Sequence, residues 1–90
     1  MSDPLERMLS KRVVLDTGTA VFYLGTLSEY DDRVFVLADA DMHDARDGHA
    51  TKEVYLAEAC REGVAVNRRT VVVMRSAVWS ISPMDDVVTG

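Results

Sequence analysis

Apolar and polar residues alternate along much of the chain with a period of two, which is typical of β-strands. The longest such run spans residues 20–30 (AVFYLGTLSEY), and its odd and even positions are expected to face opposite sides of a sheet. Shorter runs rich in β-branched residues predict four more strands, at 11–16, 33–39, 70–75 and 78–82. Turn residues separate these runs, at 17–19, 31–32 and 76–77. The pattern therefore predicts a mostly β protein.

One glycine interrupts the longest predicted strand, at Gly25. A glycine inside a strand weakens it unless the backbone must bend sharply there. Short antiparallel strands with tight links and one sharp bend predict a small, strongly bent, five-stranded barrel, because closure removes exposed sheet edges.

Two segments have the spacing of helices. Residues 4–9 place Leu5, Met8 and Leu9 on one face, which predicts a short N-terminal helix that packs on the barrel. Residues 51–62 can begin at a Thr51 cap and end at Gly63. Their apolar stripe comprises Tyr55, Leu56, Ala59 and Cys60. A strand through residues 54–56 is the competing interpretation.

The remaining segments are predicted to be irregular. Residues 41–50 (DMHDARDGHA) are polar and contain a glycine, so a loop is expected there. Pro83 is expected to end strand pairing, and residues 83–90 form a tail. The whole chain, residues 1–90, is short enough to be a single domain.

Composition narrows the classes of function. The apolar fraction is 48% and the charged fraction 28%, as in a folded protein. The net charge of −5 disfavours a DNA-binding protein that works by neutralising the phosphates of a duplex. Cys60 is the only cysteine, so an intrachain disulfide is excluded and a reducing cytoplasm is expected. We find no signal-peptide pattern and no stretch long enough to cross a membrane, so no membrane partner is expected.

Two parts of the chain resemble the sequence motifs of the Sm-like (LSm) family. Residues 23–31 (YLGTLSEYD) resemble the opening of the first motif, with an apolar residue two before a glycine, a leucine two after it, then an aromatic residue and an aspartate. Residues 37–40 resemble the end of that motif, and residues 73–78 (VMRSAV) resemble the second. The chain is similar to a divergent, bacterial-type member with an insert at 41–69.

The two motifs also depart from the family pattern. Ser76 stands where the family has glycine. The asparagine that reads the base in uridine-binding members is absent, and Arg33 or Val34 falls near its place.

The resemblance implies a ring of five to seven copies, in which the edge strands of neighbouring subunits pair. No cofactor is expected. An apolar edge strand is a liability in a monomer, and pairing between subunits would satisfy its backbone. The residues predicted to lie at this subunit interface are Val71, Val72 and Val73.

The resemblance also assigns an RNA pocket to Asp31 and Arg75. The Arg75 guanidinium could stack on a base or bind phosphate, Asp31 could orient it, and Tyr30 or Arg33 could stack on bases. In one alternative, Asp31 only fixes a turn and Arg75 only pairs with it. A second alternative concerns the whole protein, a ring or scaffold whose partner is a protein and not a nucleic acid. The acidic balance and the missing asparagine favour a protein partner, whereas the resemblance and Arg75 favour RNA.

Other candidate chemistry is weaker. An acidic cluster with two histidines occupies 39–49 but matches no calcium-loop or HExxH pattern, so a solvated loop without a metal is expected; its members are Asp39, Asp41, His43, Asp44, Asp47 and His49. Cys60 could be a nucleophile with a histidine as base, but its place on the apolar stripe favours a buried thiol. No nucleotide-binding or hydrolase motif is present, so a binding module rather than an enzyme is expected.

Two further features have alternative interpretations. Arg68 and Arg69 could contact phosphates, although a solvated turn before a strand is favoured, and the basic pair at 11–12 has the same two interpretations. Trp79 is expected on the packing face of the last strand, and an exposed position at a subunit contact is the alternative.

Overall fold

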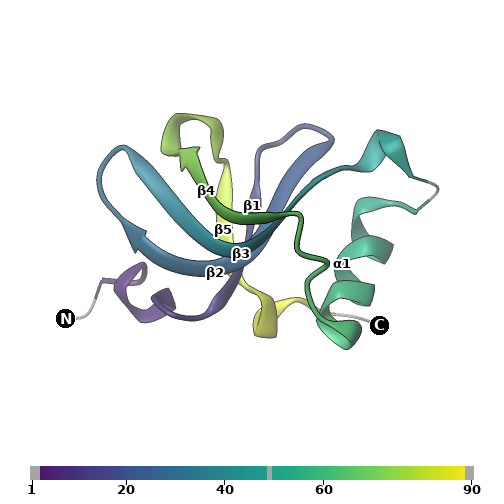
Figure 1. Cartoon of the computed structure of the whole chain (residues 1–90), viewed down its shortest axis with the longest axis horizontal. Helices are drawn as coiled ribbons and strands as arrows, with labels where there is room; N and C mark the ends of the chain where they lie inside the picture. The colour runs from purple at the N-terminus through teal and green to yellow at the C-terminus, as the bar shows by residue number, and fades with distance from the viewer. Residues whose placement is uncertain (1–2, 49, 89–90) are drawn as a thin grey trace.

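The strands of the chain form one antiparallel sheet of five strands (Figure 1). The structure is a computed structural model that describes residues 3–48 and 50–88. The strands are β1 Arg12–Asp16, β2 Val21–Tyr30, β3 Val34–Asp44, β4 Arg68–Met74 and β5 Ser80–Pro83. The helix α1 spans Lys52–Glu62, and single 3-10 turns lie at η1 Glu6–Met8, η2 Ala45–Asp47, η3 Arg75–Ala77 and η4 Met84–Asp86.

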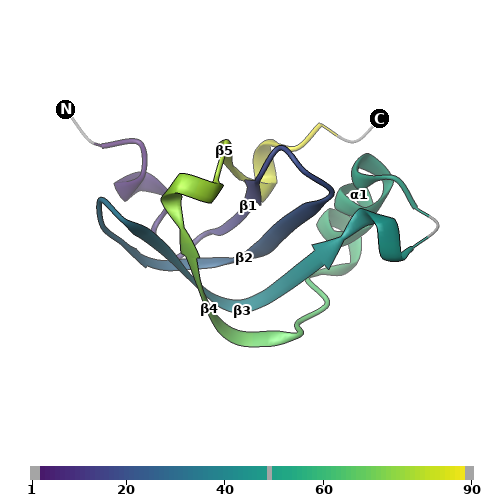
Figure 2. The ribbon, with the colours of Figure 1, turned by 90° about the horizontal axis from the view of Figure 1, so that it is seen from above.

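The order of strands across the sheet is β4-β3-β2-β1-β5, and every neighbouring pair is antiparallel. Figure 2 shows the long strands β2 and β3 curving strongly, which curls the sheet as predicted for a bent, five-stranded β fold. The sheet is not closed by a ladder between its ends, because β4 and β5 are joined through η3 without pairing in the described residues. Both end strands therefore keep one unpaired edge.

Gly25 lies where the backbones of β2 and β3 approach closely. The pairing shifts register there, from Leu24 opposite Asp41 to Thr26 opposite Ala38, so β3 carries a bulge across from the glycine. A Cβ at Gly25 would lie 3.1 Å from the Ala40 Cα, tighter than ordinary van der Waals contact. The absence of a side chain therefore permits the bend and the bulge together.

The sheet packs against two separate apolar clusters, and the side chains of β1 alternate between them. Val13 and Leu15 point into the first cluster, which lies inside the curl of the sheet. Val14 points into the second cluster, which lies beneath α1. The first also contains Leu27, Phe35, Leu37, Ala40 and Val73; the second also contains Phe22, Leu24, Ala59 and Met84.

Both predicted helical segments pack with the expected faces. Residues 51–62 form α1 rather than a strand, with the Thr51 hydroxyl accepting from the Val54 N–H and the chain turning at Gly63, whose φ is 96°. The predicted stripe of α1 packs on the second cluster. The N-terminal segment forms only the 3-10 turn η1 instead of a helix over 4–9, although its predicted face, Leu5, Met8 and Leu9, does pack on the first cluster.

The loop predicted at 41–50 is wrong in its first part, because β3 continues to Asp44. Residues 41–44 pair with residues 21–24 of β2, so backbone bonding to a neighbouring strand overrides the polar sequence. Pro83 ends β5 as expected, and beyond it Met84 is buried in the second cluster and Val87 packs against it, whereas Val88 is exposed. No helix in residues 3–48 or 50–88 is both long and apolar enough to cross a membrane.

Candidate nucleic-acid interface

The turn between β2 and β3 is held by the side chain of Asp31. Its carboxylate accepts hydrogen bonds from the backbone N–H groups of Arg33 (2.7 Å) and Val34 (2.9 Å). These two bonds, together with the positive charges of Arg33 and Arg75, lower the pKa of Asp31. The aspartate therefore fixes this turn, which is the structural role given to it by the alternative interpretation.

Arg75 ties the turn between β4 and β5 to the turn between β2 and β3. Its backbone N–H donates to the Arg33 carbonyl (2.8 Å), and its Nη1 donates to the Asp31 carbonyl (2.5 Å). The guanidinium carbon also lies 5.0 Å from the ring centroid of Phe35, within the range of a cation–π contact. Arg75 and Asp31 are therefore paired as predicted, but the guanidinium bonds to the Asp31 backbone carbonyl. The Asp31 carboxylate bonds instead to the backbone of its own turn.

Between the two turns lies a shallow depression lined by Asp32, Arg33, Met74, Arg75 and Ser76. Within residues 3–48 and 50–88, no hydrogen bond or ion pair engages the Arg33 guanidinium. The depression therefore combines one cation fixed by the protein with one that remains available to a ligand. Sequence reasoning missed Met74 and Asp32, which could have been found as the chain neighbours of Arg75 and Arg33.

Tyr30 lines a different depression, together with Glu6, Leu9, Ser28 and Glu29. Its hydroxyl donates to an Asp3 carboxylate oxygen (3.3 Å). Partial burial and the negative charges of Asp3 and Glu6 raise the pKa of Tyr30, so the phenol stays protonated at neutral pH. The structure thus brings together Asp31, Arg33 and Arg75, while Tyr30 lies in an acidic setting beside the N-terminal turn.

The acidic cluster at 39–49 does not act as one group. Asp41 is buried, and its carboxylate accepts from the Tyr55 hydroxyl and the Asn67 side-chain amide. His43 stacks on the Tyr55 ring, with centroids 3.7 Å apart. No three His, Cys, Asp or Glu side chains gather as a metal site in the part of the chain that the structure describes, and His49 lies outside it.

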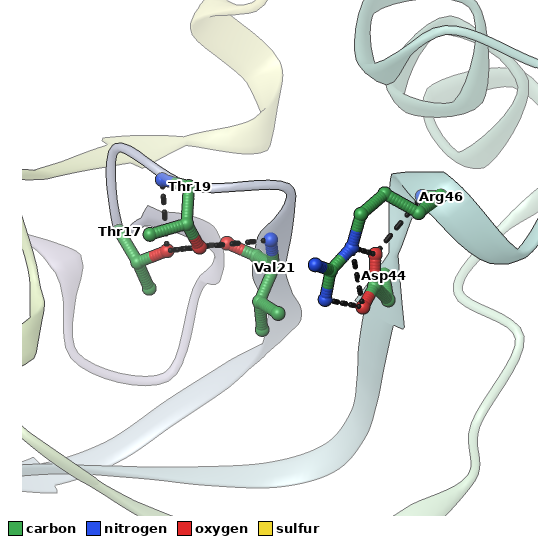
Figure 3. A network of polar contacts seen from close by, with 5 residues as sticks. All are labelled: Thr17, Thr19, Val21, Asp44 and Arg46. Atoms are coloured by element: carbon green, nitrogen blue, oxygen red, sulfur yellow. Dashed lines mark hydrogen bonds and ion pairs between the residues drawn. The ribbon is translucent and has the colours of Figure 1, made fainter.

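Asp44, another member of this cluster, pairs with Arg46 (2.6 Å, Figure 3). This contact lowers the pKa of Asp44 to about 2, because the guanidinium and the Arg46 N–H both donate to the carboxylate. The Asp44 carboxylate is therefore already bonded within the adjacent turn η2 and is not free to bind a ligand.

The structure also gives the positions of the other residues that the sequence analysis singled out. The Cys60 thiol is half-buried on α1 and donates to the Met84 carbonyl (3.5 Å). Arg68 and Arg69 are the first residues of β4 rather than part of a preceding turn. Trp79 is 80% exposed, so its expected place on the packing face of the last strand is wrong.

The predicted interface residues on β4 point in different directions. Val71 and Val73 pack into the first apolar cluster, whereas the Val72 side chain is exposed. The backbone edge of β4 remains unpaired in the described residues.

Comparisons with known proteins identify the fold. No family model matches the chain, and no curated protein sequence matches it. A solved structure of the Sm protein of Pyrococcus abyssii, determined in complex with a uridine heptamer, matches with a TM-score of 0.60 and 26% sequence identity. The match covers 91% of this chain and 99% of that chain. The chain therefore has an Sm-like fold.

Proposed function

We propose that this chain is a member of the Sm-like family and acts as a self-assembling module that binds single-stranded RNA, rather than as an enzyme. The observation that carries the proposal is the depression at Arg33 and Arg75, on an Sm-like fold whose solved neighbour binds a uridine heptamer. Ring assembly, the bacterial type and a cytoplasmic location belong to the same proposal.

The geometry of the two turns supports this site. An exposed, unengaged Arg33 can contact a phosphate or stack on a base, because a guanidinium is planar and permanently charged. The Arg75 guanidinium is already placed by the Asp31 carbonyl and the Phe35 ring, which leaves further N–H donors for a ligand. Together they offer two cations to a nucleic-acid backbone.

The test is fluorescence anisotropy with labelled oligo-uridine and oligo-adenine. Losing one charge-assisted contact costs about 1.5–3 kcal/mol, so Arg33→Ala is expected to raise the Kd at least about tenfold. Arg75→Ala is expected to do the same, and each variant should also flatten the dependence of affinity on salt. Arg61→Ala, which removes an exposed arginine from α1, is the matched control and should leave binding unchanged.

A protein-binding scaffold is the second candidate, and the net charge of −5 favours it. It predicts negligible binding of both oligonucleotides by the wild-type protein at low salt. Equal binding by the wild type and both arginine variants would instead place any RNA contact elsewhere on the chain.

A further inference from the structure

Asp32 and Arg33 are neighbours in the turn between β2 and β3, and their side chains have complementary chemistry. Both residues are exposed, and both line the depression at Arg75. Within residues 3–48 and 50–88, neither side chain takes part in an ion pair or a hydrogen bond, so the two do not neutralise each other. The depression therefore presents an unengaged carboxylate, which only accepts hydrogen bonds, beside an unengaged guanidinium, which only donates them.

The carboxylate of Asp32 has no use in binding an RNA backbone, because its negative charge repels phosphate. It does not hold the turn either, since the Asp31 carboxylate does so by accepting from the N–H groups of Arg33 and Val34. An acceptor at this position is suited instead to the N–H donors on the edge of a base.

The same depression offers a surface on which a base can stack. The Arg75 guanidinium lies 5.0 Å from the ring centroid of Phe35, and its Nη1 donates to the Asp31 carbonyl. A guanidinium plane that is fixed in this way can stack on a base. Met74, which is 57% exposed, adds apolar surface beside it. The volume of the depression, about 340 Å³, lies at the low end of the range for small-molecule sites and suits a single base.

Among the bases of RNA, guanine matches the two unengaged groups. Its O6 and N7 are adjacent acceptors, which a guanidinium binds with two hydrogen bonds. Its N1–H and N2 amino group are adjacent donors, which the two oxygens of a carboxylate can accept. Uracil has one ring N–H between two carbonyls, and adenine and cytosine each have one amino group beside ring acceptors. Each of these bases therefore leaves Asp32 or Arg33 incompletely matched.

We infer that this depression selects guanine in single-stranded RNA, with Asp32 and Arg33 as the residues that determine specificity. The base stacks on Arg75 and Met74, Arg33 donates to O6 and N7, and Asp32 accepts from N1–H and the N2 amino group. This inference rests on the proposed function and adds the base that the site prefers. It distinguishes this chain from its solved neighbour, whose ligand is a uridine heptamer.

Fluorescence anisotropy with short labelled RNAs tests the preference. UUGUU is expected to bind at least about tenfold more tightly than UUUUU or UUAUU, because a bidentate contact to a base discriminates by about this factor or more. Inosine lacks the N2 amino group, and 7-deazaguanine lacks N7. Each should lose part of the preference when it replaces the guanine, the first through Asp32 and the second through Arg33.

Asp32→Asn separates recognition of the base from binding of the backbone. The variant should lose the preference for UUGUU, because an amide places an N–H₂ donor opposite the donors of guanine. It should bind UUUUU at least as tightly as the wild type, because a charge that repels phosphate is gone. A purely structural role of Asp32 would weaken the binding of both RNAs alike. Asp85→Asn, which removes an exposed aspartate of η4 outside the depression, is the matched control and should keep the preference.

The outcomes separate this inference from the proposed function. Equal affinity for UUGUU and UUUUU, or a preference that survives Asp32→Asn, overturns the inference and leaves RNA binding through Arg33 and Arg75 intact. Displacement of labelled UUGUU by GMP as effectively as by unlabelled UUGUU would assign the site to a free guanine nucleotide and overturn it as well. If no RNA binds at low salt, the proposed function and the inference fail together.

Discussion

At the residue scale, the bend of the sheet depends on Gly25, which has no Cβ. The Cβ of any other residue there would press on backbone, 3.1 Å from the Ala40 Cα and 3.2 Å from the Ala38 carbonyl oxygen. Backbone atoms in a paired strand cannot move aside as the end of a flexible side chain can. The bulge opposite Gly25, where Asp39 has a φ of 48°, would have to shift with them.

We therefore expect Gly25→Ala to lower the free energy of unfolding by about 1–3 kcal/mol, which is the usual cost of overpacking. Urea denaturation followed by circular dichroism measures the change. Gly48→Ala is the control, because a Cβ at Gly48 meets nothing within 4 Å, and it should stay within about 0.5 kcal/mol of the wild type. Equal stability of the two variants would show that the backbone at position 25 accommodates a side chain.

At the scale of elements, α1 is fastened to the sheet by a buried polar group. Asp41 on β3 is 2% exposed and accepts from Tyr55 on α1 and from Asn67, which directly precedes β4. Asn67 also donates to the Met42 carbonyl (3.0 Å) and accepts from the Met42 N–H (3.0 Å). One carboxylate thus fixes both the helix and the start of the edge strand β4.

Tyr55→Phe removes one of the two side-chain partners of this buried carboxylate, so we expect it to destabilise the fold by about 1–3 kcal/mol. Burial and the Asp41 charge raise the pKa of Tyr55 to about 12, above its ordinary value of 10. The folded state therefore holds this proton more tightly, and the stability it contributes is complete below pH 10 and is lost as the pH rises toward 12. Denaturation between pH 8 and 12 should show a smaller loss in Tyr55→Phe than in the wild type, and identical pH profiles would contradict this role.

The strands and α1 show which parts of the fold the sequence could predict and which it could not. The five strands and α1 follow from local alternation, a helical stripe and capping residues, which act over a few positions. The extension of β3 over 41–44 could not be predicted this way, because it depends on pairing with residues 21–24 of β2. The burial of Asp41 in that extension likewise depends on side-chain partners 14 and 26 residues further along the chain. Similarly, the proximity of Asp31 and Arg75, 44 residues apart, came from a resemblance of motifs rather than from any local pattern.

At the scale of the whole molecule, the two apolar clusters belong to one cooperative unit. They share the strands β1 and β2: Val13 and Leu27 lie in the cluster inside the curl, and Val14 and Phe22 in the cluster beneath α1. A strand cannot leave one cluster without leaving the other, so α1 is part of the fold rather than an independent attachment.

We therefore expect a single unfolding transition in which far-ultraviolet circular dichroism and Trp79 fluorescence coincide at a fixed protein concentration. Leu37→Ala, in the cluster inside the curl, should destabilise the protein by about 2–5 kcal/mol. Phe22→Leu, in the cluster beneath α1, should destabilise it by about 1 kcal/mol, because it keeps most of the apolar volume. Both variants should shift the two signals together. Separate midpoints in either variant, with the helical signal lost before the fluorescence change, would instead show that α1 and its cluster unfold on their own and that β1 does not couple the two faces of the sheet.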